Sequence, residues 1–382
     1  MVVQNDNKII YFDHAATTSP MAEVVSLYSD IAANHYANSS SAHRLGIENA
    51  RLLEQARKDI LSSFKMNSHT VIFTSGATEA NNLALKGYLE KYSNRGKHLV
   101  VTNIEHPSIL NAAHHLESLG YEVTYVKAHE DGRVYVDDVK EAIRKDTILV
   151  SIMAVNNETG IVQDINNIAS YLKTLPNVAF HVDAVQAVGK VKLNYNDIDL
   201  LTVSIHKLGG LKGTGLLIKR KNIELAPLND GGGHEFGYRS GTNDLASAVT
   251  DALVLKKVLS NIDKSYEYIL ELVKPLYEYF INKQEEVVIN STIDNPYTIN
   301  ISLLHKKASV LAEYLSNHNI MVSTHSACSS KTNMGSPTLK AMGKSDVICN
   351  NAIRLSFSIT NTKEEIDTFI DVFDKGLKEI RG

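Results

Sequence analysis

Cysteine is scarce in this chain, with two residues, Cys328 and Cys349, among 382. Two thiols cannot build a disulfide framework, which excludes the small secreted domains that depend on bridges and favours a reducing compartment. The first residues, 1–8, lack the apolar stretch of a secretory signal peptide. No apolar run approaches the roughly 20 residues that a membrane-spanning helix needs. We therefore expect a cytoplasmic protein with no membrane segment.

An excess of basic residues is also missing. The formal net charge is −4, so nucleic acid is not expected as a direct partner. The sequence predicts no metal site. A hydrophobic content of 43% and a charged content of 21% are typical of a soluble globular protein, and the length allows two domains.

Apolar runs that read as strands alternate with helical patterns over the first two thirds of the chain. The predicted strands are 9–14, 70–74, 98–102, 122–126, 147–153, 178–182, 199–204 and 215–219. Predicted helices include 20–33, 49–63 and 137–145. This alternation predicts an α/β fold with a mostly parallel sheet, and nearly every polar motif directly follows a strand, where such sheets bind ligands.

The last third has a pattern of its own. Residues 245–283 predict long helical segments interrupted near Lys274–Pro275. Further predicted elements are strands at 297–303, 320–323 and 352–357 and helices at 308–316 and 362–380. We expect a large domain over 13–250 and a smaller α+β domain formed by 1–12 and 251–382.

Two residues at predicted strand ends indicate the chemistry. Lys207 follows a buried strand and precedes the glycines 209 and 210. A buried lysine needs a partner or serves as a nucleophile, because an unpaired buried ammonium is costly. Asp183 ends the preceding predicted strand. Pyridoxal phosphate (PLP) requires a lysine that forms a Schiff base and a carboxylate on its pyridine nitrogen, and this pair of motifs supplies both.

Other polar residues follow neighbouring strands. The turn Gly76-Ala77-Thr78 opens a predicted helix, which suits a phosphate but also ordinary helix capping. Ser204 and His206 are further candidate phosphate donors, and the alternative for His206 is a packed strand-end histidine. His106 has the side chain of a proton shuttle or of a ring that stacks on the cofactor.

The two cysteines and one arginine belong to the smaller domain. Cys328 lies in a polar loop, which favours a mobile nucleophile over an incidental surface thiol. Cys349 precedes an apolar strand and is expected to be structural. Arg354 lies inside an apolar strand, where its partner is either a substrate carboxylate or a buried acidic side chain.

Taken together, the motifs resemble those of the cysteine desulfurases, which are fold-type I PLP enzymes of the class V aminotransferase group. The resemblance covers nearly the whole length, and it is closest to the subgroup whose catalytic cysteine lies in a long S-A-C-x-S loop. The motifs that carry it are FDHAATT, FTSGATEANNLALKG, EHPSIL, VNNETGIVQDI, HVDAVQAVGK, SIHKLGG, GGGHEFGYRSGT, HSACSS and IRLSF. The chain departs from the family pattern at Ala37-Asn38-Ser39, Leu211 and His325.

The resemblance implies a role for each site residue. Lys207 would form the Schiff base, Asp183 would hold the pyridine nitrogen, Gln186 the ring hydroxyl, and His106 would stack on the ring. It also implies that the cofactor or its phosphate is held by Gly76, Ala77, Thr78, Asn157, Ser204, His206 and, from the second subunit of a homodimer, Thr242. Asn38, Asn157 and Arg354 would bind the substrate, and Cys328 would accept its sulfur.

The implied reaction converts L-cysteine into L-alanine and leaves a persulfide on Cys328. A sulfur-acceptor protein, a scaffold or a thiotransferase, would then take the sulfur for iron–sulfur clusters, tRNA thiolation or another thio-cofactor. Two alternatives stay open at this point. One is a related PLP enzyme such as a selenocysteine lyase or small-molecule aminotransferase, and the other is a scaffold protein that has lost catalysis.

Overall fold

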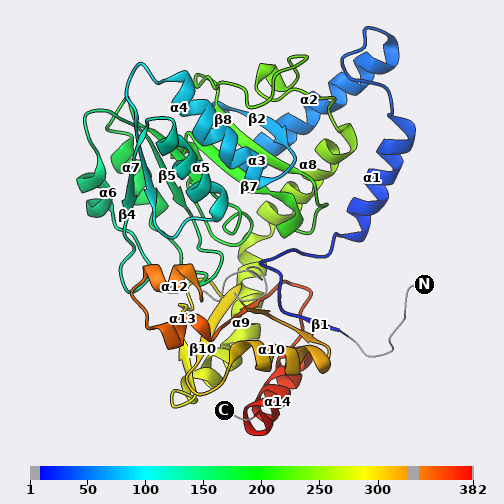
Figure 1. Ribbon diagram of the computed structural model, residues 1–382. Helices are drawn as coiled ribbons and strands as arrows, with labels where there is room; N and C mark the ends of the chain where they lie inside the picture. The colour runs from blue at the N-terminus through cyan, green and yellow to red at the C-terminus, as the bar shows by residue number, and fades with distance from the viewer. Residues whose placement is uncertain (1–8, 325–334, 381–382) are drawn as a thin grey trace.

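The computed structural model describes residues 9–324 and 335–380. Its centre is a seven-stranded sheet (Figure 1). The strands lie side by side in the order β2 (His69–Thr74), β8 (Gly215–Arg220), β7 (Leu200–Ser204), β6 (Ala179–Asp183), β5 (Thr147–Met153), β3 (His98–Thr102) and β4 (Glu122–Val126). Only β8 runs against its neighbours in this sheet. The predicted α/β fold with a mostly parallel sheet is confirmed.

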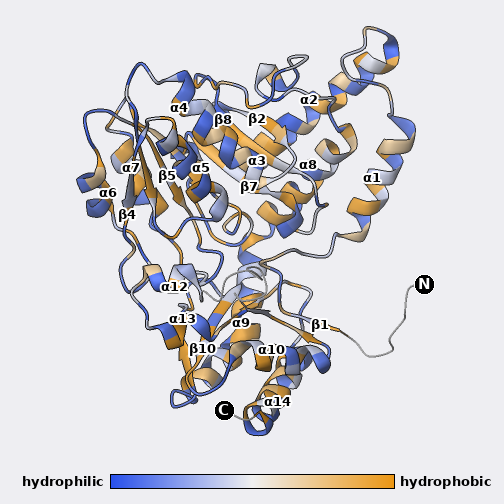
Figure 2. Cartoon of the chain, viewed as in Figure 1, coloured by the Kyte–Doolittle hydropathy of each residue, from blue (hydrophilic) through white to orange (hydrophobic). Residues whose placement is uncertain are grey.

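Helices cover the sheet, and this explains why its inner strands are apolar along their whole length. Every residue of β3, β5, β6 and β7 is buried, as expected for parallel strands with both faces covered. The strands are accordingly among the most hydrophobic parts of the ribbon in Figure 2. The helices of this part are α1 (Ala22–Asn34), α2 (Arg44–Phe64), α3 (Ala77–Asn82), α4 (Tyr88–Lys91), α5 (Pro107–Ser118), α6 (Val136–Ala142), α7 (Ile165–Leu172) and α8 (Leu245–Ser260). A π-helical turn, η1 (Leu83–Gly87), joins α3 to α4.

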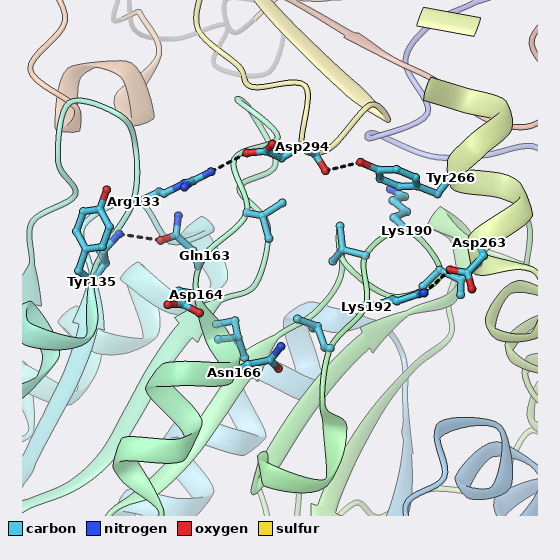
Figure 3. A pocket seen from close by; sticks show the side chains of 16 residues that line it. Arg133, Tyr135, Gln163, Asp164, Asn166, Lys190, Lys192, Asp263, Tyr266 and Asp294 are labelled. Atoms are coloured by element: carbon cyan, nitrogen blue, oxygen red, sulfur yellow. Dashed lines mark hydrogen bonds and ion pairs between the residues drawn. The ribbon is translucent and has the colours of Figure 1, made fainter. Parts of the chain in front are cut away.

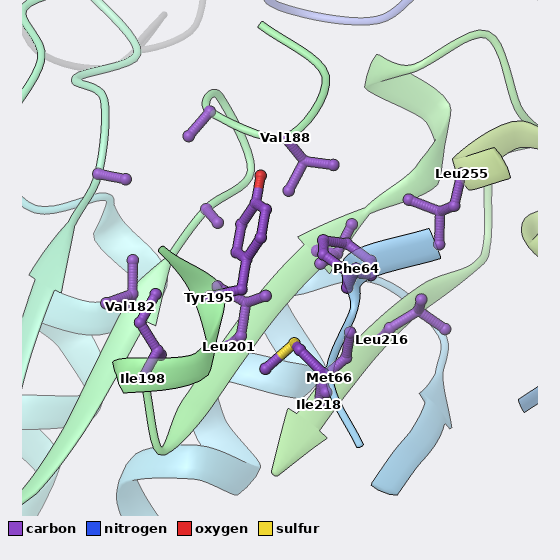
Figure 4. Packing of buried hydrophobic residues seen from close by; sticks show 14 of the residues in the cluster. Phe64, Met66, Val182, Val188, Tyr195, Ile198, Leu201, Leu216, Ile218 and Leu255 are labelled. Carbon is purple, nitrogen blue, oxygen red and sulfur yellow. The ribbon is translucent and has the colours of Figure 1, made fainter. Parts of the chain in front are cut away.

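One hydrophobic cluster shows how the helices are fixed to the sheet. Phe64 ends α2, and its ring meets the ring of Tyr195 edge-on at 4.9 Å (Figure 4). Leu201 and Leu216, from β7 and β8, belong to the same cluster. The packing therefore holds the strand that leads to Lys207 in a fixed position.

A second, smaller sheet lies below the first in Figure 1. It is antiparallel, in the order β12 (Ser323–Thr324), β13 (Ala352–Ser356), β10 (Thr298–Leu303) and β9 (Val287–Ile289). The helices around it are α9 (Ile262–Ile281), α10 (Ala308–Asn317), α12 (Pro337–Ala341), α13 (Asp346–Asn350) and α14 (Lys363–Glu379). Its core contains the contacting rings of Phe280, Phe369 and Phe373.

The N-terminal segment belongs to this second part of the molecule. Strand β1 (Ile10–Tyr11) pairs in parallel with β11 (Ile320–Met321). Phe12 is fully buried against Phe357. The segment that follows reaches the carboxyl ends of the large sheet, where Ala15 bonds to Gln186 and Lys207. The chain thus crosses between the two parts here and again at Asn261, between α8 and α9.

We propose the two-domain division expected from the sequence, and the separate cores support it. The large part has one hydrophobic cluster on each face of its sheet, and a separate core contains Ile10, Phe12 and residues from 269 to 373. Ala252 and Leu255 of α8 pack in the large core, which favours placing the boundary at Asn261 instead of residue 250.

The predicted helix interruption at Lys274–Pro275 is wrong. Pro275 lies inside α9, and the break falls at Asn261, between α8 and α9. Proline removes one helical hydrogen bond. Pro275 is on the exposed side of α9, where water can bond to the freed carbonyl, while Leu276 and Phe280 keep the helix attached to the core.

Candidate active site

The carboxyl ends of the strands surround one cavity of about 600 Å³. This volume is in the usual range for small-molecule sites. Ten of the predicted site residues line it, namely Gly76, Ala77, Thr78, His106, Asn157, Asp183, Gln186, Ser204, His206 and Lys207. They come from segments spread over more than a hundred residues of sequence, so the fold brings them together.

Lys207 ends a short 3₁₀ turn after β7. Its Nζ donates a hydrogen bond to the carbonyl oxygen of Ala15 at 2.9 Å. Burial, and after it the positive charge of Arg354, lower the pKa of Lys207 to about 8, against the opposing charges of Asp183 and Asp13. About a tenth of its amine is therefore neutral at pH 7, far more than for a free lysine, and a nucleophile requires the neutral form.

Asp183 ends β6 and is buried, with 5% of its surface exposed. Its Oδ1 accepts the backbone N–H of Val185 at 3.0 Å, and its Oδ2 accepts the side-chain amide of Asn81 at 2.8 Å. These donors hold the carboxylate in one orientation at the wall of the cavity.

His106 caps the N-terminus of α5, directly before Pro107. Its Nδ1 lies 2.8 Å from the hydroxyl of Ser108 and accepts the backbone N–H of the same serine at 3.2 Å. Burial lowers the pKa of His106, although the nearby Asp183 works in the opposite direction. The imidazole is therefore held with one nitrogen against α5 and is favoured in its neutral form.

A buried acid supports the turn before His106. Oε1 of Glu105 accepts the hydroxyl of Thr102 at 2.7 Å and the backbone N–H of Met153 at 2.8 Å. Burial raises the pKa of Glu105 to about 8, which favours the neutral acid at physiological pH. These bonds join the ends of β3 and β5 beneath the cavity.

In the part of the cavity wall where the sequence predicts phosphate binding, backbone segments lie very close together. Gly215 pairs with both Thr74 and Ser204, and a side chain at Gly215 would lie 2.7 Å from the Cα of Gly76. Nδ1 of His206 lies 3.1 Å from the hydroxyl of Thr17. Burial, together with the charges of Lys207 and Lys212, lowers the pKa of His206 to about 4, so this ring is neutral.

Arg354 lies on β13 beside the cavity. Its Nη2 pairs with Oδ1 of Asp13 at 2.8 Å, and its Nη1 donates to the carbonyl oxygen of Asn157 at 2.8 Å. Its Nε is buried and has no hydrogen-bond partner among the described residues. Both interpretations of Arg354 from the sequence are therefore supported. Asp13 is an acidic partner, and the Nε–H group is still available to donate to a substrate carboxylate.

Several residues of the site were not expected from the sequence. The carbonyl of Ala15 accepts from both Lys207 and Gln186, each at 2.9 Å. Asn81 joins the Asp183 carboxylate to the α5 region. Both lie in motifs that carried the resemblance, but Asn81 stands between the polar residues Glu79 and Asn82, so no local signal in the sequence distinguishes it.

Asn38 and Thr242 lie away from this cavity in the chain. Asn38 is exposed, and its side chain accepts the backbone N–H of Ser40 at 2.8 Å. Thr242 is exposed on a glycine-rich loop. Neither lines the cavity within this chain, so their roles stay predictions. Cys328 lies outside the described residues. Cys349 is buried on α13, and burial raises the pKa of its thiol.

A second cavity, of about 620 Å³, lies between the two parts of the molecule (Figure 3). Ion pairs cross it, from Arg133 to Asp294 at 2.8 Å and from Lys192 to Asp263 at 2.7 Å. Lys190 also borders it and donates to Oε1 of Gln186 in the first cavity at 2.9 Å. The cavity contains none of the predicted site residues, and its charged walls connect the two parts.

The residues around the first cavity fit PLP. The predicted residues of the wall supply a carboxylate, a lysine of lowered pKa, two amides, two hydroxyls and two imidazoles. Gly76, at a φ of 152°, leaves open space where a side chain would otherwise project. Among the described residues, no group of three or more His, Cys, Asp or Glu is placed to hold a metal ion, and no helix there could cross a membrane.

Comparison with known proteins identifies the family. Residues 10–369 match the family model described as aminotransferase class-V. The chain is 37% identical over 372 residues to a NifS/IcsS protein homolog of Lactobacillus delbrueckii subsp. bulgaricus, covering 96% of this chain and 97% of the relative. It is 35% identical over 380 residues to the cysteine desulfurase IscS of Dictyoglomus turgidum, covering 97% and 95%. The chain belongs to the cysteine desulfurases of the class V aminotransferase family.

Solved structures agree with this membership. A NifS-like protein superposes with a TM-score of 0.90 at 31% identity, covering 98% of this chain and all of the other. SspA in complex with cysteine superposes with a TM-score of 0.78 at 32% identity, covering 92% of this chain and all of the other. The chain therefore has the same fold-type I architecture as these two structures.

Proposed function

We propose that this protein is a PLP-dependent cysteine desulfurase, which converts L-cysteine into L-alanine and retains the sulfur as a persulfide. The observation that carries the proposal is the meeting of Lys207 and Asp183 in one cavity with His106 and Gln186. Family membership supports the choice of cofactor and reaction. PLP, when bound, supplies an electron sink for the bond changes at the substrate's carbon atoms.

Residues of the chain bind the cofactor and transfer the protons. Lys207 holds the cofactor and, once the substrate has displaced it, is the amine available to take and return a proton at the substrate's α-carbon. Asp183 binds the pyridine nitrogen, and its two hydrogen-bond donors keep the carboxylate in place. Gln186 is positioned by Ala15 and Lys190 for the ring hydroxyl.

Arg354 is the proposed site for the substrate's carboxylate. Its guanidinium is held by Asp13 and Asn157 at the edge of the cavity, and its unpaired Nε shows that its donor capacity is not exhausted. A guanidinium can bind a carboxylate through two parallel hydrogen bonds, which also fixes the orientation of the amino acid.

Cys328 is the proposed sulfur acceptor. Its thiolate attacks the substrate's sulfur, so that an S–S bond forms as the C–S bond breaks. The carbon keeps the electron pair of the broken bond and is protonated to give alanine, and the sulfur remains on Cys328 as a persulfide. One cysteine and one thiol yield one alanine and one persulfide, without an external oxidant.

We also propose that the protein is a homodimer that delivers sulfur to an acceptor protein. Exposed Thr242 lies on a loop outside its own cavity, which fits a contact with a second copy. SspA, a structural neighbour, is solved with cysteine, which supports the choice of substrate. A reducing, cytoplasmic setting fits a reaction that needs a free thiol.

The test is incubation of the PLP-loaded protein with L-cysteine, with alanine quantified and persulfide located by mass spectrometry. We expect one persulfide on Cys328 and none on Cys349. Cys328→Ala should lower alanine formation by at least about 100-fold, and Cys349→Ala should leave it near the wild-type rate. Wild-type alanine formation by Cys328→Ala would favour the lyase alternative, and a persulfide on Cys349 would overturn the assignment of Cys328 as the sulfur acceptor.

A further inference from the structure

A chain of buried hydrogen bonds connects Asp183 to His106 through two residues of other elements. Nδ2 of Asn81, on α3, lies 2.8 Å from Oδ2 of Asp183 and 2.9 Å from Oγ of Ser108. Oγ of Ser108, on α5, lies 2.8 Å from Nδ1 of His106. Asn81 is fully buried and Ser108 is 8% exposed, so neither bond is replaced by water.

The direction of these hydrogen bonds follows from the charge at one end. An ionised carboxylate can only accept hydrogen bonds, so the Asn81 amide must present its NH₂ group to Asp183. The opposite orientation would place the amide oxygen against the carboxylate. The same NH₂ group contacts Ser108, so Oγ of Ser108 accepts one of its two hydrogens.

The contacts of Ser108 also determine the direction of the hydrogen bond to His106. An oxygen that accepts from Asn81 still has a second lone pair, so the direction of its bond to His106 is set by Nδ1, which already accepts the backbone N–H of Ser108 and therefore takes the hydroxyl hydrogen as well. The backbone N–H of Ser108 also points to Nδ1, at 3.2 Å. A ring nitrogen that accepts two hydrogen bonds carries no hydrogen of its own.

We propose that Asn81 and Ser108 act as positioning residues that fix His106 in the neutral tautomer with its proton on Nε2. The inference rests on the proposed function only in taking the cavity as the active site. His106 therefore meets a ligand as a hydrogen-bond donor, and in this state it cannot take up a proton at the nitrogen that faces the cavity. This refines the expected general acid or base role of His106 to that of a donor.

Two further observations support the assignment. The carbonyl oxygen of Asn81 is buried and has no partner among the described residues, so the amide keeps its orientation at the expense of an unsatisfied acceptor. Such groups are rare unless the site requires them. Burial also lowers the pKa of His106, in keeping with a neutral ring.

The tautomer can be measured without turnover, by NMR of protein labelled with ¹⁵N in its histidine rings, with and without PLP. The ¹⁵N shifts and their couplings to ring protons distinguish the two neutral tautomers from the cation, and His106→Gln identifies the signals. We expect the Nε2–H tautomer near pH 7. An Nδ1–H tautomer or a charged ring in the wild-type protein would overturn the proposal, whether or not the protein is a desulfurase.

Variants of Asn81 and Ser108, which form the hydrogen-bond relay between Asp183 and His106, distinguish a positioning role from a general loss of structure. Ser108→Ala and Asn81→Ala should convert the single tautomer into a mixture, and Ser108→Thr, which keeps the hydroxyl, should restore it. Asn82→Ala is the matched control, because Asn82 is on the same helix and its amide bonds only to the carbonyl of Thr78, at 2.9 Å. An unchanged tautomer in both Ser108→Ala and Asn81→Ala would refute the relay, and the wild-type measurement stands even if a variant fails to fold.

Activity gives a second readout. For Ser108→Ala we expect kcat for alanine formation to fall about 10- to 100-fold, at the low end of acid–base contributions, with KM nearly unchanged. Asn82→Ala should keep the wild-type kcat. A loss of the same size in Asn82→Ala would show that the effect is general to the helix and would contradict a specific role for Ser108.

Discussion

At the scale of single residues, Lys207 is a lysine in a buried position, where the charged form of its amine is disfavoured. Its pKa of about 8 is below that of an exposed lysine, because burial disfavours the ammonium and Arg354 repels it. Since only the neutral amine attacks an aldehyde, the rate at which the apoprotein takes up PLP covalently should rise with pH and level off above about 8. Stopped-flow absorbance measured across pH 6–10 checks this profile.

Arg354→Gln tests the second cause of that shift. Removing the positive charge should move the midpoint of the uptake profile upward, but not to the value of a free lysine, since burial remains the larger cause. A profile that is flat between pH 7 and 9, or a midpoint that moves down in the variant, would contradict this account of Lys207.

The shape of Arg354 should matter as well as its charge. Arg354→Lys keeps the positive charge but removes the fork that can hold a carboxylate through two bonds. We expect kcat/KM for L-cysteine to fall about 10- to 100-fold, the loss of one hydrogen bond to a charged group, mainly through KM. Steady-state kinetics measure this, and unchanged absorbance of the bound cofactor is the control. An unchanged KM would place the substrate's carboxylate elsewhere.

At the scale of elements, the sequence predicted the buried strands well. The predicted limits 98–102 and 147–153 are those of the buried strands β3 and β5. A strand covered on both faces is apolar along its length, and its limits are visible without knowledge of its neighbours. The contacts of Asn81 and Ala15 could not be predicted in this way, because their partners are more than a hundred residues away in sequence.

Helix α9 shows the opposite case, in which a local rule gave the wrong result. Pro275 predicted a break, but the helix continues because its buried residues hold it against the smaller core. The local penalty should still be present. We expect Pro275→Ala to stabilise the smaller domain by about 1–3 kcal/mol, up to the cost of a proline inside a helix.

This prediction can be checked by thermal unfolding, where the transition of the smaller domain should move up by a few degrees. Lys274→Ala, at the adjacent exposed position, is the control and should change the transition by less than 1 °C. A lower transition temperature for Pro275→Ala would mean that the proline is part of the packing and not a tolerated defect.

At the scale of the whole molecule, the proposed dimer predicts that two inactive variants can restore activity when mixed, which two monomers could not do. Glu235 forms a buried ion pair with Arg57 of α2, at 2.5 Å, and so fixes the loop that carries Thr242. If Thr242 completes the cavity of the second copy, each site takes Lys207 from one chain and Thr242 from the other. Lys207→Ala and Thr242→Ala proteins should then complement each other when mixed.

A hybrid dimer would have one site with both residues intact and one with neither. Random pairing gives hybrids in half of the dimers, so we expect about a quarter of the wild-type sites to be active. Alanine formation at limiting PLP, after the chains have been unfolded and refolded together, measures this. Activity equal to the sum of the separate variants would show that Thr242 serves its own chain or no site at all.

The N-terminal segment has a consequence for how the protein is made on the ribosome. Ala15 holds Lys207 and Gln186, yet its neighbour Asp13 bonds to Arg354, 341 positions later in the chain. Contacts so distant in sequence close last, after nearly all of the chain has emerged. The N-terminal segment therefore reaches its final contacts only after Arg354 has been synthesised, and a nascent or truncated chain cannot assemble a complete site.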